Sequence, residues 1–336
     1  MTAPHILDDA SRAERLLDLV APKLQQVDEE IRRNFRSEIR TIHEVGEHIL
    51  AGGGKRLRPA LLLIASQMLG YEGSRDVLYG AVVEFIHTAT LIHDDVIDEA
   101  DLRRGRDSIN HKWGNNLTVL AGDYLFINSM DMALKDGNGS IEILRLLSSV
   151  TIKMIEGEIL GLETNGRADL TVDDYFGIVH RKTAALFAAC CRIPGYLTEV
   201  SATHSEALHE YGYNLGICFQ LIDDILDFTS SEEVLGKPVL SDVREGKVTL
   251  PLILAMPRAT EGERALITHV AGSHSFEGIE PADILAIVER YDALNEARSI
   301  ARGYADRARG ALALFPESPA RQALEMALDF VMERDR

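Results

Sequence analysis

The stretch LIHDDVIDEADLRRG, residues 91–105, places five acidic residues within eight positions, directly after an apolar run and directly before two arginines. The apolar run has the pattern of a buried α-helix. On such a helix, positions i and i+4 lie on one face, about one turn apart. Asp94 and Asp98 therefore point the same way, with Asp95 beside them. The sequence thus predicts a carboxylate cluster at the end of an apolar helix.

A second segment, LIDDILDF at residues 221–228, repeats this geometry with Asp223, Asp224 and Asp227. A solvated acidic face is the ordinary interpretation of a charge run, but both clusters follow apolar helices. At about 5.5 Å and an effective dielectric near 20, each like-charge pair costs roughly 3 kcal/mol. Two such clusters in partly buried places need a cation. Carboxylate oxygens that share a metal with substrate phosphates suit Mg²⁺.

Helical periodicity recurs along nearly the whole chain, and β-type alternation is scarce. The expected helices cover residues 11–35, 59–69, 76–98, 117–134, 141–162, 172–197, 205–228, 251–256, 284–315 with breaks, and 320–333. The loops between them are too short and too ordinary in composition to be domain linkers. We therefore expect one all-α domain, residues 1–336.

The composition limits the kind of partner and the cellular setting. A net charge of −18 argues against nucleic acid or an anionic membrane as a general partner. The three cysteines, Cys190, Cys191 and Cys218, form no CxxC pattern, which favours a reducing interior. The N-terminus lacks the features of a signal peptide, and no apolar run reaches the length of a membrane span. A soluble, cytoplasmic protein is expected.

In so acidic a chain, an anionic ligand must be met by a metal or by a local basic cluster. GGKRLRP, residues 53–59, is one such cluster, since adjacent glycines allow close backbone approach and Lys55, Arg56 and Arg58 supply charge. A solvated turn is the alternative. His87 precedes Asp94 by nearly two turns and shares its stripe, so it is either a ligand-binding residue or an ordinary core histidine.

Further polar residues could serve an anion site. Arg103 and Arg104 directly follow the first cluster and could bind diphosphate oxygens left over by a metal at Asp94 and Asp98. Five others are individually unremarkable and are more often surface or capping residues: Lys182, Thr183, Gln220, Lys237 and Lys247.

Taken together, these segments resemble the trans-isoprenyl diphosphate synthase family, specifically its long-chain polyprenyl members. The resemblance runs from about residue 45 to 260. It includes GGKRLRP, EFIHTATLIHDDVIDEADLRRG, GDYLF, RKTA and GICFQLIDDILDF followed by GK. It implies a bundle of mostly antiparallel helices around a central cavity, and a homodimer.

The resemblance also implies two diphosphate sites. Isopentenyl diphosphate would be bound by Lys55, Arg58, His87 and Arg104. The allylic diphosphate would be bound through Mg²⁺ on Asp94, Asp98 and Asp223, with direct contacts from Arg103, Lys182, Thr183, Gln220, Lys237 and Lys247. Asp95, Asp224 and Asp227 would belong to the same metal clusters, as ligands or through ordered water.

The implied chemistry agrees with these residues. Three Mg²⁺ ions, with lysine and arginine, would neutralise the leaving diphosphate of the allylic substrate in a dry pocket. The allylic cation would then be attacked by the double bond of isopentenyl diphosphate, and the departing diphosphate would take the proton. No side-chain nucleophile or general base is therefore assigned. Transient membrane association is expected for product release.

Product length is predicted from the residues just before the first cluster. Short-chain members commonly carry bulky aromatics four or five residues before the first aspartate, where this chain has Thr90 and Ala89. Because one helical turn rises about 5.4 Å, close to one isoprene unit, small residues there predict a long all-trans product of about eight to ten units. Such products form quinone side chains. Phe126 or Met130 could form the floor of the tunnel, or Ala89 could merely pack against a neighbouring helix.

Other functions fit parts of the sequence. Glu84-x-x-His87 and Glu206-x-x-His209 have the spacing of di-iron helical bundles, but iron would leave the glycine and lysine motifs unexplained. A non-catalytic subunit would be expected to lose aspartates or the GGKR element. A terpene cyclase would need no isopentenyl site. A farnesyl or geranylgeranyl diphosphate synthase of the same family is the nearest alternative.

Overall fold

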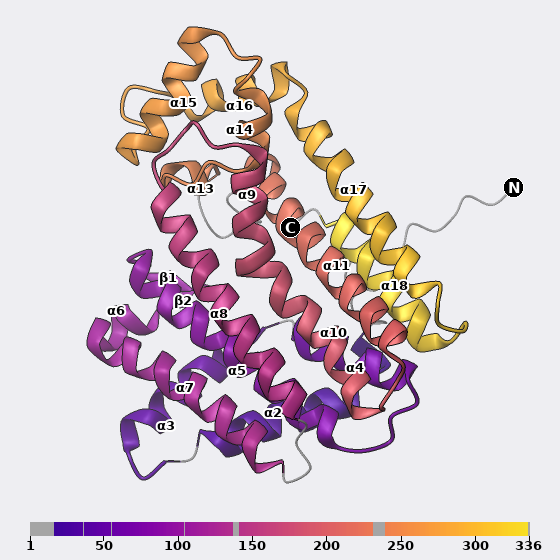
Figure 1. The fold of residues 1–336 in the computed structure, drawn as a ribbon. Helices are drawn as coiled ribbons and strands as arrows, with labels where there is room; N and C mark the ends of the chain where they lie inside the picture. The colour runs from indigo at the N-terminus through magenta and orange to yellow at the C-terminus, as the bar shows by residue number, and fades with distance from the viewer. Residues whose placement is uncertain are drawn as a thin grey trace, which may run out of the picture. The chain divides into compact units, whose positions relative to one another are not determined.

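The computed structural model describes residues 17–35, 37–54, 56–103, 105–136, 141–230 and 239–334. Within these residues the regular structure is helical apart from one small antiparallel hairpin, β1 (Leu102–Arg103) and β2 (Arg106–Asp107) (Figure 1). The helices are α2 (Ala21–Asn34), α3 (Arg40–Ala51), α4 (Leu57–Met68), α5 (Arg75–Ile97), α6 (Ile109–Trp113), α7 (Asn115–Lys135), α8 (Ile141–Thr164), α9 (Val172–Val179), the π-helix η1 (His180–Ala184), α10 (Ala185–Leu197), α11 (Ala202–Thr229), α13 (Ser241–Arg244), α14 (Leu250–Ala255), α15 (Glu261–Ser273), α16 (Pro281–Arg290), α17 (Ala293–Leu312) and α18 (Pro319–Met332). The predicted all-α class is confirmed.

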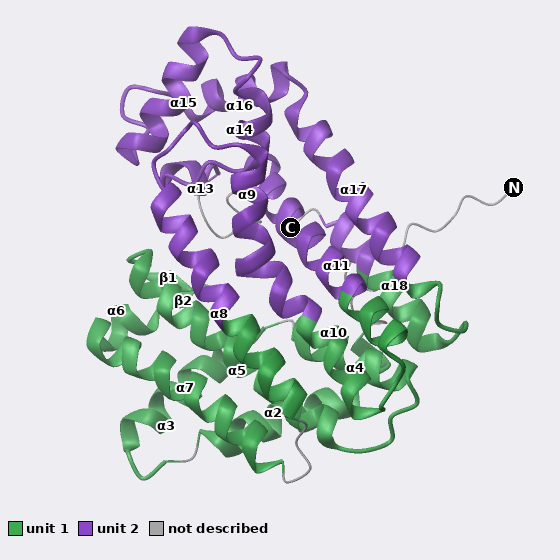
Figure 2. Cartoon of the chain, viewed as in Figure 1, with its two compact units in different colours: residues 1–151, 189–209, 312–327 green, residues 152–188, 210–311, 328–336 purple. Residues whose placement is uncertain are grey.

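The chain divides into two compact units (Figure 2). Unit 1 contains residues 1–151, 189–209 and 312–327, and unit 2 contains residues 152–188, 210–311 and 328–336. The boundaries fall inside α8, α10, α11, α17 and α18. The organisation of residues 1–336 as a single domain stays a prediction.

The core of unit 1 is built around α5, which packs against α2, α4 and α7. This helix is apolar on almost all sides, and a helix of that kind is stable only when neighbours surround it. Close approach to α7 depends on Gly122, where a Cβ atom would come within 2.3 Å of His93 Nε2. The His93 ring in turn lies 3.2 Å from the Val119 carbonyl oxygen. The first aspartate cluster therefore ends a helix that is held firmly by packing.

Unit 2 contains the second aspartate cluster, near the end of α11. In this unit α9 begins with a capping box in which Thr171 and Asp174 exchange hydrogen bonds. It continues directly into η1. Farther along the chain, α14 packs against α9 and α16, and α13 packs against α15. A second capping box, Thr260 with Glu263, starts α15.

Several elements differ from the sequence-based expectation. Helices α3, α6, α13 and α15 were not predicted, because they are short or only moderately apolar and tertiary contacts stabilise them. The predicted helix over residues 172–197 is regular except at η1, where five residues adopt π-helical hydrogen bonding. Of the predicted helix at residues 11–35, positions 11–16 lie outside the described residues, and α2 starts at Ala21.

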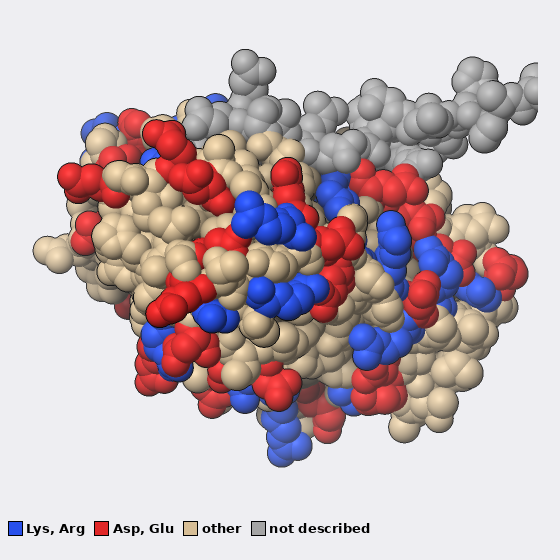
Figure 3. Space-filling model, turned by 90° about the horizontal axis from the view of Figure 1, so that it is seen from above, with Lys and Arg blue, Asp and Glu red and all other residues tan. Residues whose placement is uncertain are grey.

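On the molecular face in Figure 3, lysine and arginine side chains are interspersed with aspartate and glutamate. Positive charge on that face therefore occurs in small groups bordered by acidic residues, in keeping with the strongly acidic composition. Among the helices that the structure describes, none combines the length and apolar character needed to cross a bilayer.

Candidate active site

The first aspartate motif lies where α5 ends in unit 1. Asp94 is half-buried in the last turn of the helix, whereas Asp98 is the exposed C-cap residue, whose backbone N–H donates to the Asp94 carbonyl oxygen at 2.8 Å. The predicted i, i+4 relation is therefore present. These two carboxylates are the ones of the motif that are not buried.

The middle residue of the motif, Asp95, has a different environment. It is buried, and its Oδ1 accepts a hydrogen bond from Arg103 Nε at 2.6 Å, with Arg103 Nη2 at 2.5 Å from the same oxygen. Burial raises the pKa of Asp95, Arg103 lowers it, and the neighbouring charge of Asp98 raises it again. Arg103 stands on β1, so this ion pair ties the hairpin to α5.

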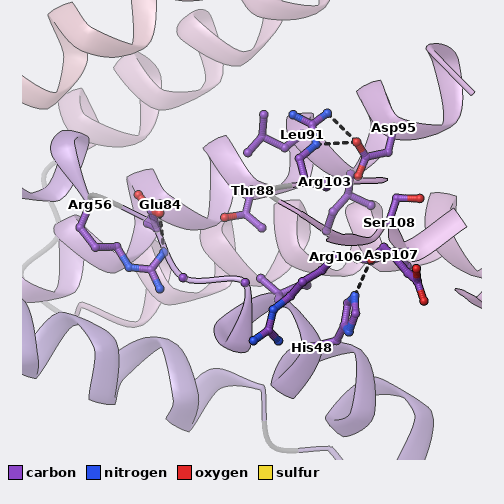
Figure 4. Close-up of a pocket in the computed structure, with 15 residues that line it drawn as sticks. His48, Arg56, Glu84, Thr88, Leu91, Asp95, Arg103, Arg106, Asp107 and Ser108 are labelled. Atoms are coloured by element: carbon purple, nitrogen blue, oxygen red, sulfur yellow. Dashed lines mark hydrogen bonds and ion pairs between the residues drawn. The ribbon is translucent and has the colours of Figure 1, made fainter. Parts of the chain in front are cut away.

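A pocket of unit 1 lies beside this ion pair (Figure 4). Its lining comes from the end of α3 and the glycine loop that follows it (residues 52–54), from α5, and from the hairpin with the start of α6. The lining residues are 48, 49, 52, 53, 56, 84, 88, 91, 92, 95, 103 and 106–109. His48 Nε2 lies 2.8 Å from the Asp107 carbonyl oxygen and so links α3 to the hairpin. The glycine loop and the β1–β2 hairpin, which carries Arg103 and Arg106, are far apart in the sequence but line the same pocket.

Two of the residues predicted to bind isopentenyl diphosphate are in contact in unit 1. Arg58 Nη1 donates a hydrogen bond to His87 Nε2 at 3.0 Å. Because a guanidinium group has only donors, Nε2 of His87 must be the unprotonated ring nitrogen. The other two predicted residues, Lys55 and Arg104, lie outside the described residues.

Arg56, between Lys55 and Arg58, is committed to a structural role. Its Nη1 donates to Glu84 at 2.6 Å and its Nε to Asp28 at 2.9 Å. Burial lowers the pKa of Arg56, but the two carboxylates outweigh it and raise the pKa above the ordinary value. These ion pairs hold Arg56 in the left-handed backbone region, with φ at 46°. They fix the turn that leads from the glycine loop into α4.

The positions predicted to control chain length also lie in unit 1. Ala89 is buried in α5, and Thr90 is half-buried, with its Oγ1 donating to the His87 carbonyl oxygen at 2.8 Å. Phe126 and Met130 are half-buried on α7, which packs against α5. The two small residues therefore stand in a packed helix, one turn before Asp94.

The second aspartate motif is more enclosed. Asp223 forms an ion pair with Arg334. Asp224 is buried, and it accepts hydrogen bonds from Tyr175 Oη at 2.6 Å and from Gln220 Nε2 at 2.8 Å. Burial and the nearby charge of Asp242 raise the pKa of the Asp224 carboxyl to about 7.

Thr183 extends this network, since its Oγ1 donates to Gln220 Oε1 at 2.8 Å. Three of the residues predicted to serve the allylic diphosphate, Thr183, Gln220 and Asp224, therefore form one hydrogen-bonded chain inside unit 2. Such a chain fixes the amide orientation of Gln220, because each of its ends has one suitable partner.

Asp227 stabilises the fold locally. It is buried, and its carboxylate accepts hydrogen bonds from the backbone N–H and hydroxyl of Ser241 and from the Asp242 N–H, at 3.2, 2.8 and 3.1 Å. These contacts hold the start of α13 against α11. Lys247, beyond α13, donates from Nζ to Glu245 at 2.8 Å, and Lys237 lies outside the described residues.

Lys182 stands on the π-helix η1 and forms an ion pair with Glu158 of α8. A π-helical turn inside an α-helix is rare and is frequent at functional sites. Gly157 allows the close approach of α8 at this point, because a Cβ atom there would lie 2.6 Å from the Lys182 backbone nitrogen. On α11, Gly216 leaves room in the same way for Ala184, with a Cβ contact of 2.8 Å.

Comparison with known proteins assigns the chain to a family. The sequence model of the polyprenyl synthetase family matches residues 39–287, which include both aspartate motifs, the GGKRLRP element and η1. The chain belongs to the polyprenyl synthetase family. It is therefore an enzyme, a prenyltransferase of isoprenoid biosynthesis.

Relatives of this polyprenyl synthetase cover nearly its whole length. Octaprenyl diphosphate synthase of Escherichia coli is 37% identical over 324 residues, which span 96% of this chain and 99% of the relative. A short chain isoprenyl diphosphate synthase of Methanothermobacter thermautotrophicus is 36% identical over 324 residues, spanning 95% and 99%. A polyprenyl synthase structure from Caulobacter crescentus, complexed with calcium and isoprenyl diphosphate, matches with a TM-score of 0.90 and 37% identity over 96% of this chain and 98% of that one. The relatives thus include both long-chain and short-chain enzymes.

The di-iron alternative gains no support within this polyprenyl synthetase. Glu84 is paired with Arg56, and Glu206 lies 3.4 Å from Arg192. His87 is in contact with Arg58. In the part of the chain that the structure describes, no three His, Cys, Asp or Glu residues are grouped so that they alone could hold a metal ion.

Some residues of the polyprenyl synthetase site were missed by sequence reasoning. Tyr175, Glu158 and Arg334 each contact a predicted site residue, but none belongs to a motif quoted for the family resemblance. Arg334 is 111 positions from its partner Asp223. Only the tertiary structure can identify contacts over such separations. A weak local signal existed for Glu158 alone, since it follows Gly157 on an apolar helix.

Proposed function

We propose that the enzyme adds successive isopentenyl diphosphate units to an allylic diphosphate and releases a long all-trans polyprenyl diphosphate. The observation that supports isopentenyl diphosphate as a substrate is the contact between Arg58 Nη1 and His87 Nε2, which lie 3.0 Å apart. These residues come from separate motifs, and a synthase that condenses needs an anion site of this kind in addition to carboxylates. A terpene cyclase would not need it.

Mg²⁺ suits the carboxylates of this chain. Mg²⁺ usually keeps several waters and binds through one or two carboxylates together with substrate phosphates, so a cage of protein ligands is not required. Asp94 and Asp98, one turn apart and only partly buried, fit this mode in unit 1, and Asp223 fits it in unit 2. When bound, Mg²⁺ would act as a Lewis acid that neutralises the leaving diphosphate. The number of ions, three by family resemblance, is part of the proposal.

The residues of the chain would contribute binding, orientation and charge. Lys182 and Arg103 supply positive charge for the allylic diphosphate, and their present partners, Glu158 and Asp95, hold both side chains in defined positions. The network of Thr183, Gln220 and Asp224 offers polar atoms in a fixed orientation. Lys55, Arg104, Lys237 and Lys247 stay predicted contacts.

The reaction itself is tested with purified protein. Incorporation of radiolabelled isopentenyl diphosphate into a longer allylic product should stop with EDTA and return with Mg²⁺. Conversion of the allylic substrate to a hydrocarbon without incorporation would indicate a cyclase. Stoichiometric bound iron would favour the di-iron alternative.

A product of about eight to ten units is proposed because Ala89 and Thr90 place no bulk one helical turn, about 5.4 Å, before Asp94. Met130 or Phe126 on α7 would then limit the chain. Mass analysis should show a long product for the wild type and a shorter one for Ala89→Phe. A wild-type product of fifteen or twenty carbons would favour the farnesyl or geranylgeranyl alternative. Quinone side chains are the proposed use of a long product, with transient membrane association at release and a cytoplasmic setting.

A homodimer is proposed from an exposed apolar stripe on α7. Leu120, Ile127 and Leu134 recur every seven residues and are 64%, 64% and 66% exposed. Apolar residues at this spacing form a seam suited to a partner helix. In a twofold-symmetric dimer, this stripe would pack against the same stripe of the second copy. Sedimentation should give a dimer for the wild type and a monomer for Ile127→Glu.

A further inference from the structure

The first carboxylate of the second motif has an arginine as its partner. Asp223 forms an ion pair with Arg334, which follows α18 within unit 2. The guanidinium of Arg334 also lies over the ring of Phe219, 4.6 Å from its centroid, and the side chain is only 12% exposed. Packing thus fixes a positive charge at the most exposed carboxylate of this motif, since Asp224 and Asp227 are buried among their own donors.

A fixed guanidinium has opposite effects on a metal ion and on an anion. Arginine keeps its charge under all ordinary conditions, so it opposes the arrival of a free divalent cation at the same carboxylate. The same charge attracts a diphosphate and can donate hydrogen bonds to it. The Nε–H of Arg334 is buried and donates to no acceptor among the described residues, so its present contacts do not satisfy every donor of the guanidinium.

We propose that Arg334 makes metal binding at Asp223 depend on diphosphate. It weakens the binding of a free divalent cation and strengthens the binding of that cation together with a diphosphate. The second motif would then select the metal–diphosphate complex over the metal alone. The inference rests on the proposed function, in which the allylic substrate supplies the diphosphate.

The test measures metal binding rather than turnover. Free Mn²⁺ is followed by electron paramagnetic resonance in the full-length protein, with and without inorganic diphosphate. Since a charge-assisted contact is worth about 1.5–3 kcal/mol, Arg334→Gln should bind Mn²⁺ alone at least about tenfold more tightly. In the same variant, inorganic diphosphate should strengthen Mn²⁺ binding by about tenfold less than in the wild type. Arg334→Lys, which keeps the charge, should retain most of the coupling.

Two controls make the result specific. Arg309→Gln removes an arginine that pairs with Asp329 at 2.6 Å, elsewhere in unit 2, and it should leave both affinities unchanged. In an Asp223→Asn background, Arg334→Gln should have no further effect. Unchanged Mn²⁺ affinity in Arg334→Gln, equal changes in Arg309→Gln, or an effect that persists without Asp223 would overturn the inference. A failed condensation assay would instead contradict the proposed function, because these measurements use only Mn²⁺ and inorganic diphosphate.

Discussion

The two DDxxD motifs share one sequence pattern but occupy different environments. In the first, Asp94 and Asp98 lie at the end of a helix, half-buried and exposed, and only Asp95 is buried. In the second, the motif lies inside α11, and both Asp224 and Asp227 are buried. The first motif therefore has two carboxylates that are not buried, and the second has one, Asp223, which is paired with Arg334.

The difference shows that spacing alone does not assign a role to each aspartate. The middle residue is buried and hydrogen-bonded in both motifs, but Asp95 is held by a charged arginine and Asp224 by the neutral donors of Tyr175 and Gln220. The last residue differs more, since Asp98 caps its own helix and Asp227 fixes the start of another. We therefore expect the metal role for the carboxylates that are not buried.

The largest expected effect concerns Asp94, one of the carboxylates that are not buried. Asp94→Ala should reduce condensation by at least about a thousandfold, because neutralisation of the leaving group depends on it. The helical circular dichroism should be unchanged, since the substitution removes like-charge repulsion. Asp101→Asn is the matched control, because Asp101 belongs to the same acidic stretch but its side chain is 81% exposed and faces His111. Near-normal turnover in Asp94→Ala would contradict the assignment.

The next effect concerns stability and separates the two motifs. Asp227→Ala leaves the Ser241 and Asp242 donors without their acceptor and should lower the free energy of unfolding by about 3 kcal/mol. Asp98→Ala, the equivalent position of the first motif, should change it by less than about 0.5 kcal/mol. Urea unfolding of both variants measures the contrast. Equal losses would show that Asp98 and Asp227 contribute equally to the free energy of unfolding.

Substrate affinity should separate the basic residues of the two units. Arg58→Ala should raise KM for isopentenyl diphosphate about ten- to a hundredfold, because it removes a charge-assisted contact. Lys182→Ala should act mainly on the allylic substrate and on kcat. Arg40→Ala is a control in which a 90% exposed arginine is lost from unit 1. If Arg58→Ala altered only the allylic KM, the two substrates would be assigned to the wrong residues.

The smallest effect contrasts the two middle aspartates by pH. The folded-state pKa of Asp224 is raised to about 7. Its contribution to stability is therefore complete below its ordinary value near 3.8, and it is lost as the pH rises through about 7. In EDTA, the stability of Asp224→Asn relative to wild type should thus increase between pH 5 and 8, by up to about 1 kcal/mol per pH unit. Asp95→Asn should lower stability throughout this range, because it leaves Arg103 without its ion pair. A flat difference for Asp224→Asn would show that this carboxyl is already ionised.

Sequence reasoning predicted most of the fold because the signal is local. The periodicity of α5 and α11 and the punctuation between helices are properties of neighbouring residues, and they placed α5, α7, α8 and α11 within a few positions of their observed ends. The short helices α3 and α13 and the π-helical turn at Lys182 were not predicted. Their stability depends on contacts such as Asp227 with Ser241 and Gly157 with the Lys182 backbone.

The sequence by itself determined the family, the reaction class and the identity of the carboxylates, because spaced motifs on helices put given side chains on one face whatever surrounds them. Only the tertiary structure decided which carboxylates are buried. Burial and hydrogen-bond partners come from segments far away in the chain, such as Tyr175 for Asp224 and Arg334 for Asp223. The spacing of aspartates along a helix is the same whether they are buried or exposed. Their pKa values and their availability to a metal depend on what packs against them.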